Sequence, residues 1–149
     1  MARFFDLDAA NGTLPELRTI LETLRDERAQ LIALRDEFAR QATLETSPGE
    51  AAVGRSSDDA AGRNREHAAE RKRLRLRMQG VIDQMQAGVA RIDDLGITLR
   101  EIETGLVDFP ALVSGRQIWL CWRLGEGDIE WWHELSDGFG GRKPLIELA

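Results

Sequence analysis

The sequence predicts an α+β fold, in which a long antiparallel helical hairpin of coiled-coil type is followed by a small antiparallel β-sheet. Three observations lead to this prediction. Two segments of roughly 30 residues each repeat apolar side chains every three or four positions, as amphipathic helices do. Between them, residues 46–62 are rich in Gly, Ser and Asp. All four tryptophans then fall between residues 119 and 132, among residues that favour strands.

Composition limits the fold and its setting. The chain has 149 residues, a formal net charge of −6 and one cysteine, which suits a single domain over residues 1–149. One cysteine excludes an internal disulfide and a Cys-rich zinc site. No apolar run approaches the ~18 residues of a membrane-spanning helix, and the first residues do not form a signal peptide. We therefore expect a soluble cytoplasmic protein with no membrane association.

The first helix is predicted over residues 13–45. Thr13 and Glu16 match a capping box, and Pro15 is tolerated in the first helical turn. The preceding residues, 8–12, either form a separate turn or join the helix. The apolar stripe consists of Leu17, Ile20, Leu21, Leu24, Leu31, Leu34 and Phe38.

A flexible loop over residues 46–62 and a second helix over residues 64–95 are predicted to follow. The loop has a single bulky apolar residue, Val53, which is too little to offset the entropy of ordering it. The helix has a heptad stripe with spacings of four and three. That stripe consists of Leu74, Met78, Val81, Met85, Gly88, Ile92 and Leu95. Neither helix can bury its stripe alone, so we expect an antiparallel hairpin.

The start of the second helix, residues 63–77, is rich in arginine. One interpretation is a surface for nucleic acid or an acidic partner, which predicts salt-sensitive binding. The favoured reading is a solvated helix face, partly neutralised by Asp36, Glu37 and Glu45 of the first helix. No aromatic residues interleave with the arginines, and the chain is acidic overall, so nucleic acid is the less favoured partner.

The last third of the chain is predicted to be a β-meander over residues 97–145. Residues 97–102 favour one strand. Residues 117–124 and 129–135 favour a hairpin, because the Gly- and Asp-containing stretch at 125–128 is a turn signal.

The register of this hairpin is predicted from charge and hydropathy. If Leu124 lies opposite Ile129, Arg123 faces Glu130, an oppositely charged pair. The core face is then Ile118, Leu120, Trp122, Leu124, Ile129, Trp131, His133 and Leu135. The other face is Trp119, Cys121, Arg123, Glu130, Trp132 and Glu134. His133 thus points away from Cys121, which argues against a metal site or a Cys–His pair, and Cys121 is predicted to be a small buried hydrophobe.

The candidate ligand- or partner-binding residues lie on the mixed face and in two flanking loops. Trp119 and Trp132 with neighbouring charges form a surface typical of interfaces and ligand clefts, unless another part of the chain covers it. The loops are residues 105–110 and 137–145, and the second offers an anion-binding nest supported by Arg142 and Lys143. The full set is Asp108, Arg116, Trp119, Arg123, Glu126, Trp132, Glu134 and Arg142.

A further signal lies in residues 105–145, which read GLVDFPALVSGRQIWLCWRLGEGDIEWWHELSDGFGGRKPL. The runs GLVDFP, GR, LCWRLGE, WHE and GF-GR-PL, with the opening FFDLDAANGTLPEL, resemble an uncharacterised bacterial family, domain of unknown function 2203 (DUF2203). The resemblance implies a helical N-terminal region before this signature, and it implies no activity. The signature covers Asp108, Pro110, Gly115, Arg116, Cys121, Trp122, Arg123, Gly125, Glu126, Trp132, His133, Glu134, Gly138 and Arg142.

These observations predict a non-enzymatic interaction or ligand-binding module that uses the Trp- and Arg-rich sheet. A long helix pair leaves surplus apolar surface, so we expect a homodimer, with a protein partner or a small anionic ligand as candidate partners. No cofactor and no metal are predicted. The alternative is a small metal-dependent or hydrolytic enzyme that uses Asp108, Glu126, His133 and Glu134, and it requires His133 to face a cleft.

Overall fold

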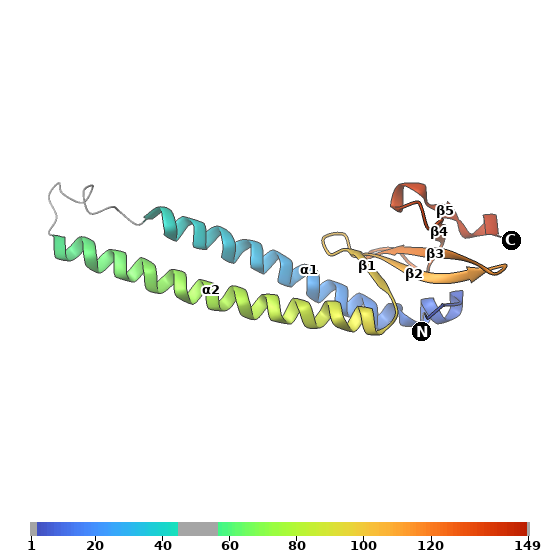
Figure 1. The fold of residues 1–149 in the computed structure, drawn as a ribbon, viewed down its shortest axis with the longest axis horizontal. Helices are drawn as coiled ribbons and strands as arrows, with labels where there is room; N and C mark the ends of the chain where they lie inside the picture. Colours follow the sequence, from blue (N-terminus) through green and yellow to red (C-terminus); the bar gives the residue numbers. More distant parts are fainter. Residues whose placement is uncertain (1–2, 45–56, 149) are drawn as a thin grey trace. The chain divides into compact units, whose positions relative to one another are not determined.

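The computed structural model describes residues 3–44 and 57–148, and the predicted α+β fold is confirmed (Figure 1). Two long helices precede a five-stranded antiparallel sheet of order β1-β2-β3-β4-β5. The elements are α1 (Leu7–Leu44), α2 (Ser57–Asp94), β1 (Thr98–Glu101), β2 (Leu106–Val113), β3 (Arg116–Arg123), β4 (Trp131–His133), η2 (Phe139–Gly141), β5 (Lys143–Pro144) and η3 (Leu145–Leu148). Within the two described ranges, no helix has the length and apolar character to cross a membrane.

The chain divides into two compact units. Unit 1 comprises Met1–Arg28 and Met85–Ala149, and it holds the start of α1, the end of α2 and the whole sheet. Unit 2 comprises Ala29–Gln84 and holds the remaining turns of both helices. The prediction that the chain is one domain stays a prediction.

Helix α1 begins at Leu7, earlier than predicted. Its N-cap is Asp6, whose Oδ1 accepts a hydrogen bond from the N–H of Ala9 at 2.7 Å. Thr13 is not the cap, because its hydroxyl donates to the carbonyl of Ala10 at 2.7 Å within the helix. The capping-box prediction was wrong because an upstream aspartate satisfies the free N–H groups first, so residues 8–12 join the same helix.

Helix α2 also begins early, at Ser57, so the loop predicted over residues 46–62 is wrong for 57–62, and the rest of it lies outside the described residues. Asp58 and Asp59 in the first turn interact favourably with the positive end of the helix dipole. The predicted apolar stripe is confirmed as the packing face. Its most buried members are Leu74, Val81 and Ile92.

The predicted neutralisation of the arginine-rich run by α1 is wrong for two of its three residues. Asp36 pairs with Arg35, and Glu37 pairs with Arg40, in both cases within α1. Glu37 and Arg40 are three positions apart and therefore neighbours on the helix surface, which favours this local pair. Glu45 lies outside the described residues.

One face of the sheet forms a core with the parts of α1 and α2 that belong to unit 1. Phe109 of β2 is fully buried and packs edge to face against Phe5, with ring centroids 5.2 Å apart. The same cluster contains Leu14, Leu17, Leu21, Leu24, Ile92, Val107, Ile118, Leu120 and Trp122. We call the opposite face of the sheet the outer face. Because strand side chains alternate, every second residue of β2 and β3 points to it.

Strand β2 replaces the loop predicted at residues 105–110. Val107 and Phe109 are both buried on the core face, and this alternation makes the segment a strand. The strand tolerates Pro110 because the N and C=O of one residue point to the same side of a strand. The C=O of Pro110 accepts a hydrogen bond from the N–H of Phe5 at 2.8 Å. The missing N–H of Pro110 therefore falls on a side where β1 has already ended.

The pairing of β3 with β4 differs from the predicted register by one residue. Leu120 lies opposite Trp132, and Trp119 lies opposite His133. Arg123 pairs with Leu106 of β2 and not with Glu130. Because a shift of one residue turns every side chain of a strand to the other face, Trp132 joins the core and His133 moves to the outer face.

The connection between β3 and β4 explains this shift. It is not a tight hairpin, because the N–H of Ile129 donates to the Asn11 side chain of α1 at 2.8 Å. The indole N–H of Trp122 also donates to the carbonyl of Gly127 at 2.8 Å. The loop is thus shaped by contacts with the core and the helix, and these decide where β4 begins.

Candidate functional site

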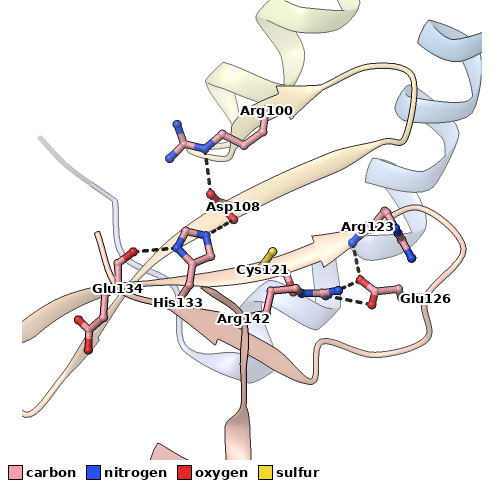
Figure 2. A network of polar contacts seen from close by, with 8 residues as sticks. All are labelled: Arg100, Asp108, Cys121, Arg123, Glu126, His133, Glu134 and Arg142. Carbon is pink, nitrogen blue, oxygen red and sulfur yellow. Dashed lines mark hydrogen bonds and ion pairs between the residues drawn. The ribbon is translucent and has the colours of Figure 1, made fainter. Parts of the chain in front are cut away.

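Three buried side chains meet on the outer face of the sheet (Figure 2). Asp108, Cys121 and His133 come from β2, β3 and β4, and Asp108 lies directly opposite Cys121. Each offers one metal-ligand atom, and these atoms all lie within 4.8 Å of one another. None of the three residues is more than 2% exposed. We call them the Asp–Cys–His cluster.

The imidazole of His133 is held at both of its nitrogens. Nδ1 lies 2.8 Å from the carbonyl oxygen of Glu134, and Nε2 lies 3.0 Å from Oδ1 of Asp108. A carbonyl oxygen only accepts, so the contact with Glu134 places a ring N–H on Nδ1, while Nε2 faces the carboxyl group of Asp108. The prediction that His133 is a core residue, on the face away from Cys121, was wrong because of the one-residue shift in register.

Asp108 is paired on its second oxygen as well. The Nε of Arg100 donates to Oδ2 at 2.8 Å. Arg100 is the extra residue of a β-bulge, because Leu99 and Glu101 are the residues that pair with β2. A bulge turns a side chain away from its regular direction, and here it brings the guanidinium to the buried carboxylate. The guanidinium carbon also lies 4.9 Å from the ring centroid of Trp119.

Cys121 is a protonated thiol at neutral pH. Burial, the largest cause, and the nearby Asp108 carboxylate together raise its pKa from 9.0 to about 12, while Arg142 acts in the opposite direction. The prediction of a small buried side chain is confirmed. Without a cation to replace its proton, this thiol is a poor nucleophile.

We expect Cys121 to make the metal-free protein less stable at alkaline pH. The folded pKa is about 12 and the ordinary value is 9.0, so above pH 9 the unfolded chain releases a proton that the folded chain keeps. This contribution to stability is intact below pH 9 and is lost between pH 9 and 12. At pH 10 the loss is about 1 kcal/mol.

Urea unfolding of wild type and Cys121→Ala in chelator, near neutral pH and again at about pH 10, measures this loss. Other titrating groups are shared by the two proteins and cancel in the comparison. Wild type should lose about 1 kcal/mol more than the variant. Equal losses would contradict the raised pKa.

Arg142 fixes the segment after β4 beside the cluster (Figure 2). Its Nη2 donates to both carboxylate oxygens of Glu126, at 2.7 and 2.9 Å, and lies 3.4 Å from the carbonyl oxygen of Cys121. The guanidinium lies over the rings of Phe139 and Trp131, at 4.5 and 4.9 Å. Its side chain is only 10% exposed, so this ion pair is shielded from water.

The anion-binding nest predicted for residues 137–145 stays a prediction, and two observations argue against it. One common form of nest alternates between the right- and left-handed backbone regions. Among the described glycines, positive φ occurs at Gly96, Gly105, Gly115 and Gly125, all before this segment. Both predicted cations are also engaged, because Arg142 binds Glu126 and Lys143 lies 5.0 Å from the ring of Trp132.

The structure does not bring the other predicted site residues together into one site. Arg116 and Glu134 form an ion pair with each other. Trp119 is half-buried on the outer face, but Trp132 is buried in the core, so the predicted surface with both tryptophans does not exist. The misplaced register of β4 caused this error. Of the set predicted for an enzyme, Asp108 and His133 meet, whereas Glu126 pairs with Arg142 and Glu134 contributes only its backbone carbonyl.

Sequence reasoning missed Arg100 and excluded Cys121. A β-bulge has no signal in a single short strand, so Arg100 looked like any charged strand residue. Cys121 offered a signal, as the single cysteine of the chain with a histidine in the next strand. The predicted register placed these two residues on opposite faces and removed that signal.

A cavity of about 350 Å³ opens beside the cluster. Asp108 is the cluster residue that lines it. The other lining residues are Arg100, Glu101, Leu106, Leu135, Asp137, Gly138 and Phe139. All belong to unit 1, so the cluster and the cavity form one site within a single compact unit.

Comparison with known proteins gives one match. A family model described as an uncharacterised conserved protein (DUF2203) matches residues 3–145, nearly the whole chain. No curated protein and no solved structure matches the chain.

Proposed function

The chain belongs to the uncharacterised conserved family DUF2203, whose description assigns no activity, and from its own site we propose that it binds one transition-metal ion, zinc by its ligand chemistry. One observation carries the proposal: the ligand atoms of Asp108, Cys121 and His133 all lie within 4.8 Å of one another in a buried place. Thiolate, imidazole and carboxylate are the ligands that zinc takes in proteins.

The distances suit a tetrahedral ion. Nε2 of His133 and Oδ1 of Asp108 are 3.0 Å apart. Two zinc ligands at 2.0–2.1 Å from the metal are separated by about 3.3 Å in a tetrahedron. An ion can therefore take a place between these two atoms with little movement, and it would displace the proton of the Cys121 thiol.

The neighbours of the cluster favour a metal ligand set as well. Metal-binding histidines commonly donate their second ring N–H to a carbonyl, as Nδ1 of His133 does to Glu134. Arg100 holds the other oxygen of Asp108 and orients the carboxylate. Three protein ligands leave one position of a tetrahedral ion for water or a ligand, the arrangement of catalytic zinc sites. The cavity lined by Asp108 offers the space for it.

Native mass spectrometry of the reduced chain, stripped by chelator and then incubated with zinc, tests this proposal. We expect one ion per chain. Co²⁺ in place of zinc should show a thiolate-to-cobalt charge-transfer band, which reports the sulfur ligand directly. Cys121→Ser should abolish that band and weaken zinc binding, measured against a chromophoric chelator, at least about 100-fold.

The matched control is Glu134→Gln. This change removes a carboxylate next to His133 but leaves the backbone carbonyl that His133 contacts, so zinc affinity should stay unchanged. Circular dichroism checks that both variants are folded. A wild-type chain that holds no zinc, or a Cys121→Ser chain that holds it equally well, would refute the proposal.

A second candidate function, an interaction module that forms a homodimer, is supported by an apolar groove of about 410 Å³ in unit 1. It is lined by Phe5, Asp6, Leu7, Ala111, Leu112, Val113, Leu120, Leu145 and Leu148. Leu7 and Leu112 are 40% and 51% exposed there, which favours a partner surface. The same native mass spectrum reports the dimer, and a monomer at tens of micromolar would exclude it.

A further inference from the structure

The cavity beside the Asp–Cys–His cluster has walls of three kinds. Leu106, Leu135 and Phe139 are apolar, Arg100 is cationic, and Glu101, Asp108 and Asp137 are acidic. Its volume of about 350 Å³ falls within the range of small-molecule sites, about 300–1,000 Å³. A site of this kind binds a small molecule by a few placed polar groups and an apolar wall.

Arg100 presents a fixed cationic edge. Its Nε is bound to Asp108 at 2.8 Å, and its guanidinium lies over Trp119. Figure 2 shows Nε turned toward Asp108 and the two terminal nitrogens on the far side of the guanidinium. In the described part of the chain, these terminal nitrogens have no hydrogen-bond acceptor. A guanidinium held in place with a free edge is well suited to a carboxylate.

Two carboxylates of the cavity stand uncompensated. Asp108 is already paired with Arg100 and His133, whereas Glu101 and Asp137 are exposed and have no ion pair among the described residues. An ammonium group is the natural partner for such a pair of carboxylates. A ligand with an anionic group alone would be repelled by these carboxylates, and a ligand with a cationic group alone would leave the terminal nitrogens of Arg100 without a partner.

We propose that this cavity binds a small zwitterion of the α-amino acid class with an apolar side chain. Its carboxylate pairs with Arg100, its ammonium group lies between Glu101 and Asp137, and its side chain packs on Leu106, Leu135 and Phe139. The inference goes beyond metal binding, because it rests on the lining of the cavity and not on the cluster.

Three matched probes test the proposal. L-leucine carries both charges, N-acetyl-L-leucine lacks the ammonium group, and isopentylamine lacks the carboxylate. Each is titrated into ¹⁵N-labelled full-length protein, and the amide signal of Gly138 is followed by NMR. Leucine should give a saturable shift, and both analogues should bind at least about tenfold more weakly, since each loses one charge-assisted contact.

The variant Asp137→Asn identifies the ammonium contact. It should weaken leucine binding about tenfold and should not weaken the binding of N-acetyl-L-leucine, because the acetylated probe has no ammonium group to lose its partner. The control is Asp128→Asn, which alters an exposed carboxylate outside the cavity lining and should bind leucine like wild type. Absence of a saturable leucine shift, or equal binding of the three probes, overturns the proposal.

The titrations are run on both metal-free and zinc-incubated protein, so each proposal can be refuted without the other. Leucine binding without zinc uptake refutes the metal site and leaves the zwitterion site standing. Zinc uptake without leucine binding refutes the zwitterion site alone.

Discussion

We expect Asp108→Ala to lower the free energy of unfolding by about 3–5 kcal/mol. The side chain of Asp108 is only 4% exposed, and one of its oxygens contacts Nε2 of His133 while the other accepts a hydrogen bond from Arg100. Alanine would leave the buried Nε2 of His133 without its partner, and removing one member of a buried pair costs far more than the pair contributes. Urea unfolding of the metal-free protein measures the change.

Asp108→Asn separates the charge of Asp108 from its hydrogen bonds, and Glu134→Gln is the control. Asp108→Asn keeps an acceptor and the shape of the side chain, so its free energy of unfolding should lie between those of Asp108→Ala and wild type. Glu134→Gln breaks a more exposed ion pair with Arg116, and such pairs contribute less than about 1 kcal/mol. If Asp108→Ala costs no more than Glu134→Gln, the buried network does not stabilise the fold.

The second large effect is expected at Trp122. Its side chain is fully buried in the core of unit 1, and its indole N–H donates to the carbonyl of Gly127. Trp122→Ala should destabilise the protein by about 3–5 kcal/mol, because it leaves a large cavity and frees a loop that shapes the register of β4. Thermal unfolding followed by circular dichroism measures this change.

Trp122→Phe and Trp119→Ala are the matched variants. Phenylalanine fills most of the space but loses the hydrogen bond to Gly127, so it should cost less than alanine. Trp119 is half-buried on the outer face, and its removal should cost less than that of Trp122 because less surface returns to water. A Trp119→Ala variant less stable than Trp122→Ala would contradict the assignment of the core to the face of the sheet that carries Trp122.

The two proposed sites and the stability of unit 1 depend on the same residues. Asp108 orients the cluster, pairs with Arg100 and lines the cavity, so its replacement should affect folding, zinc and leucine together. Asp137 lies outside the core, and its replacement should affect the ligand alone. Comparing these two variants therefore tells a loss of folding from a loss of binding.

Much of the architecture was predictable from local patterns. The stripe of Leu74, Val81 and Ile92 marked the buried face of α2, because helical side chains repeat with a period of 3.6 residues. The strands β1 and β3 fall where strand-favouring residues gather, within one residue of the predicted bounds at each end. The signature over residues 105–145 identified DUF2203, the family whose model matches the chain.

The site was not predictable in the same way. Its geometry depends on which face of the sheet β4 presents, and one residue of register decides that. The predicted cross-strand pair of Arg123 with Glu130 was chemically reasonable, but it competed with a contact that local patterns do not reveal. Ile129 binds Asn11, 118 positions earlier in the chain, and the loop follows that contact.

The sequence by itself determined the family, the α+β class and the core faces of the helices, because these follow from side-chain periodicity and from short motifs. Only the tertiary structure decided that Asp108, Cys121 and His133 share one face, and that Arg100 reaches them. Those placements come from a bulge and from a loop bound to a distant helix. Such long-range contacts decide register by their combined free energy, which no local stretch of residues encodes.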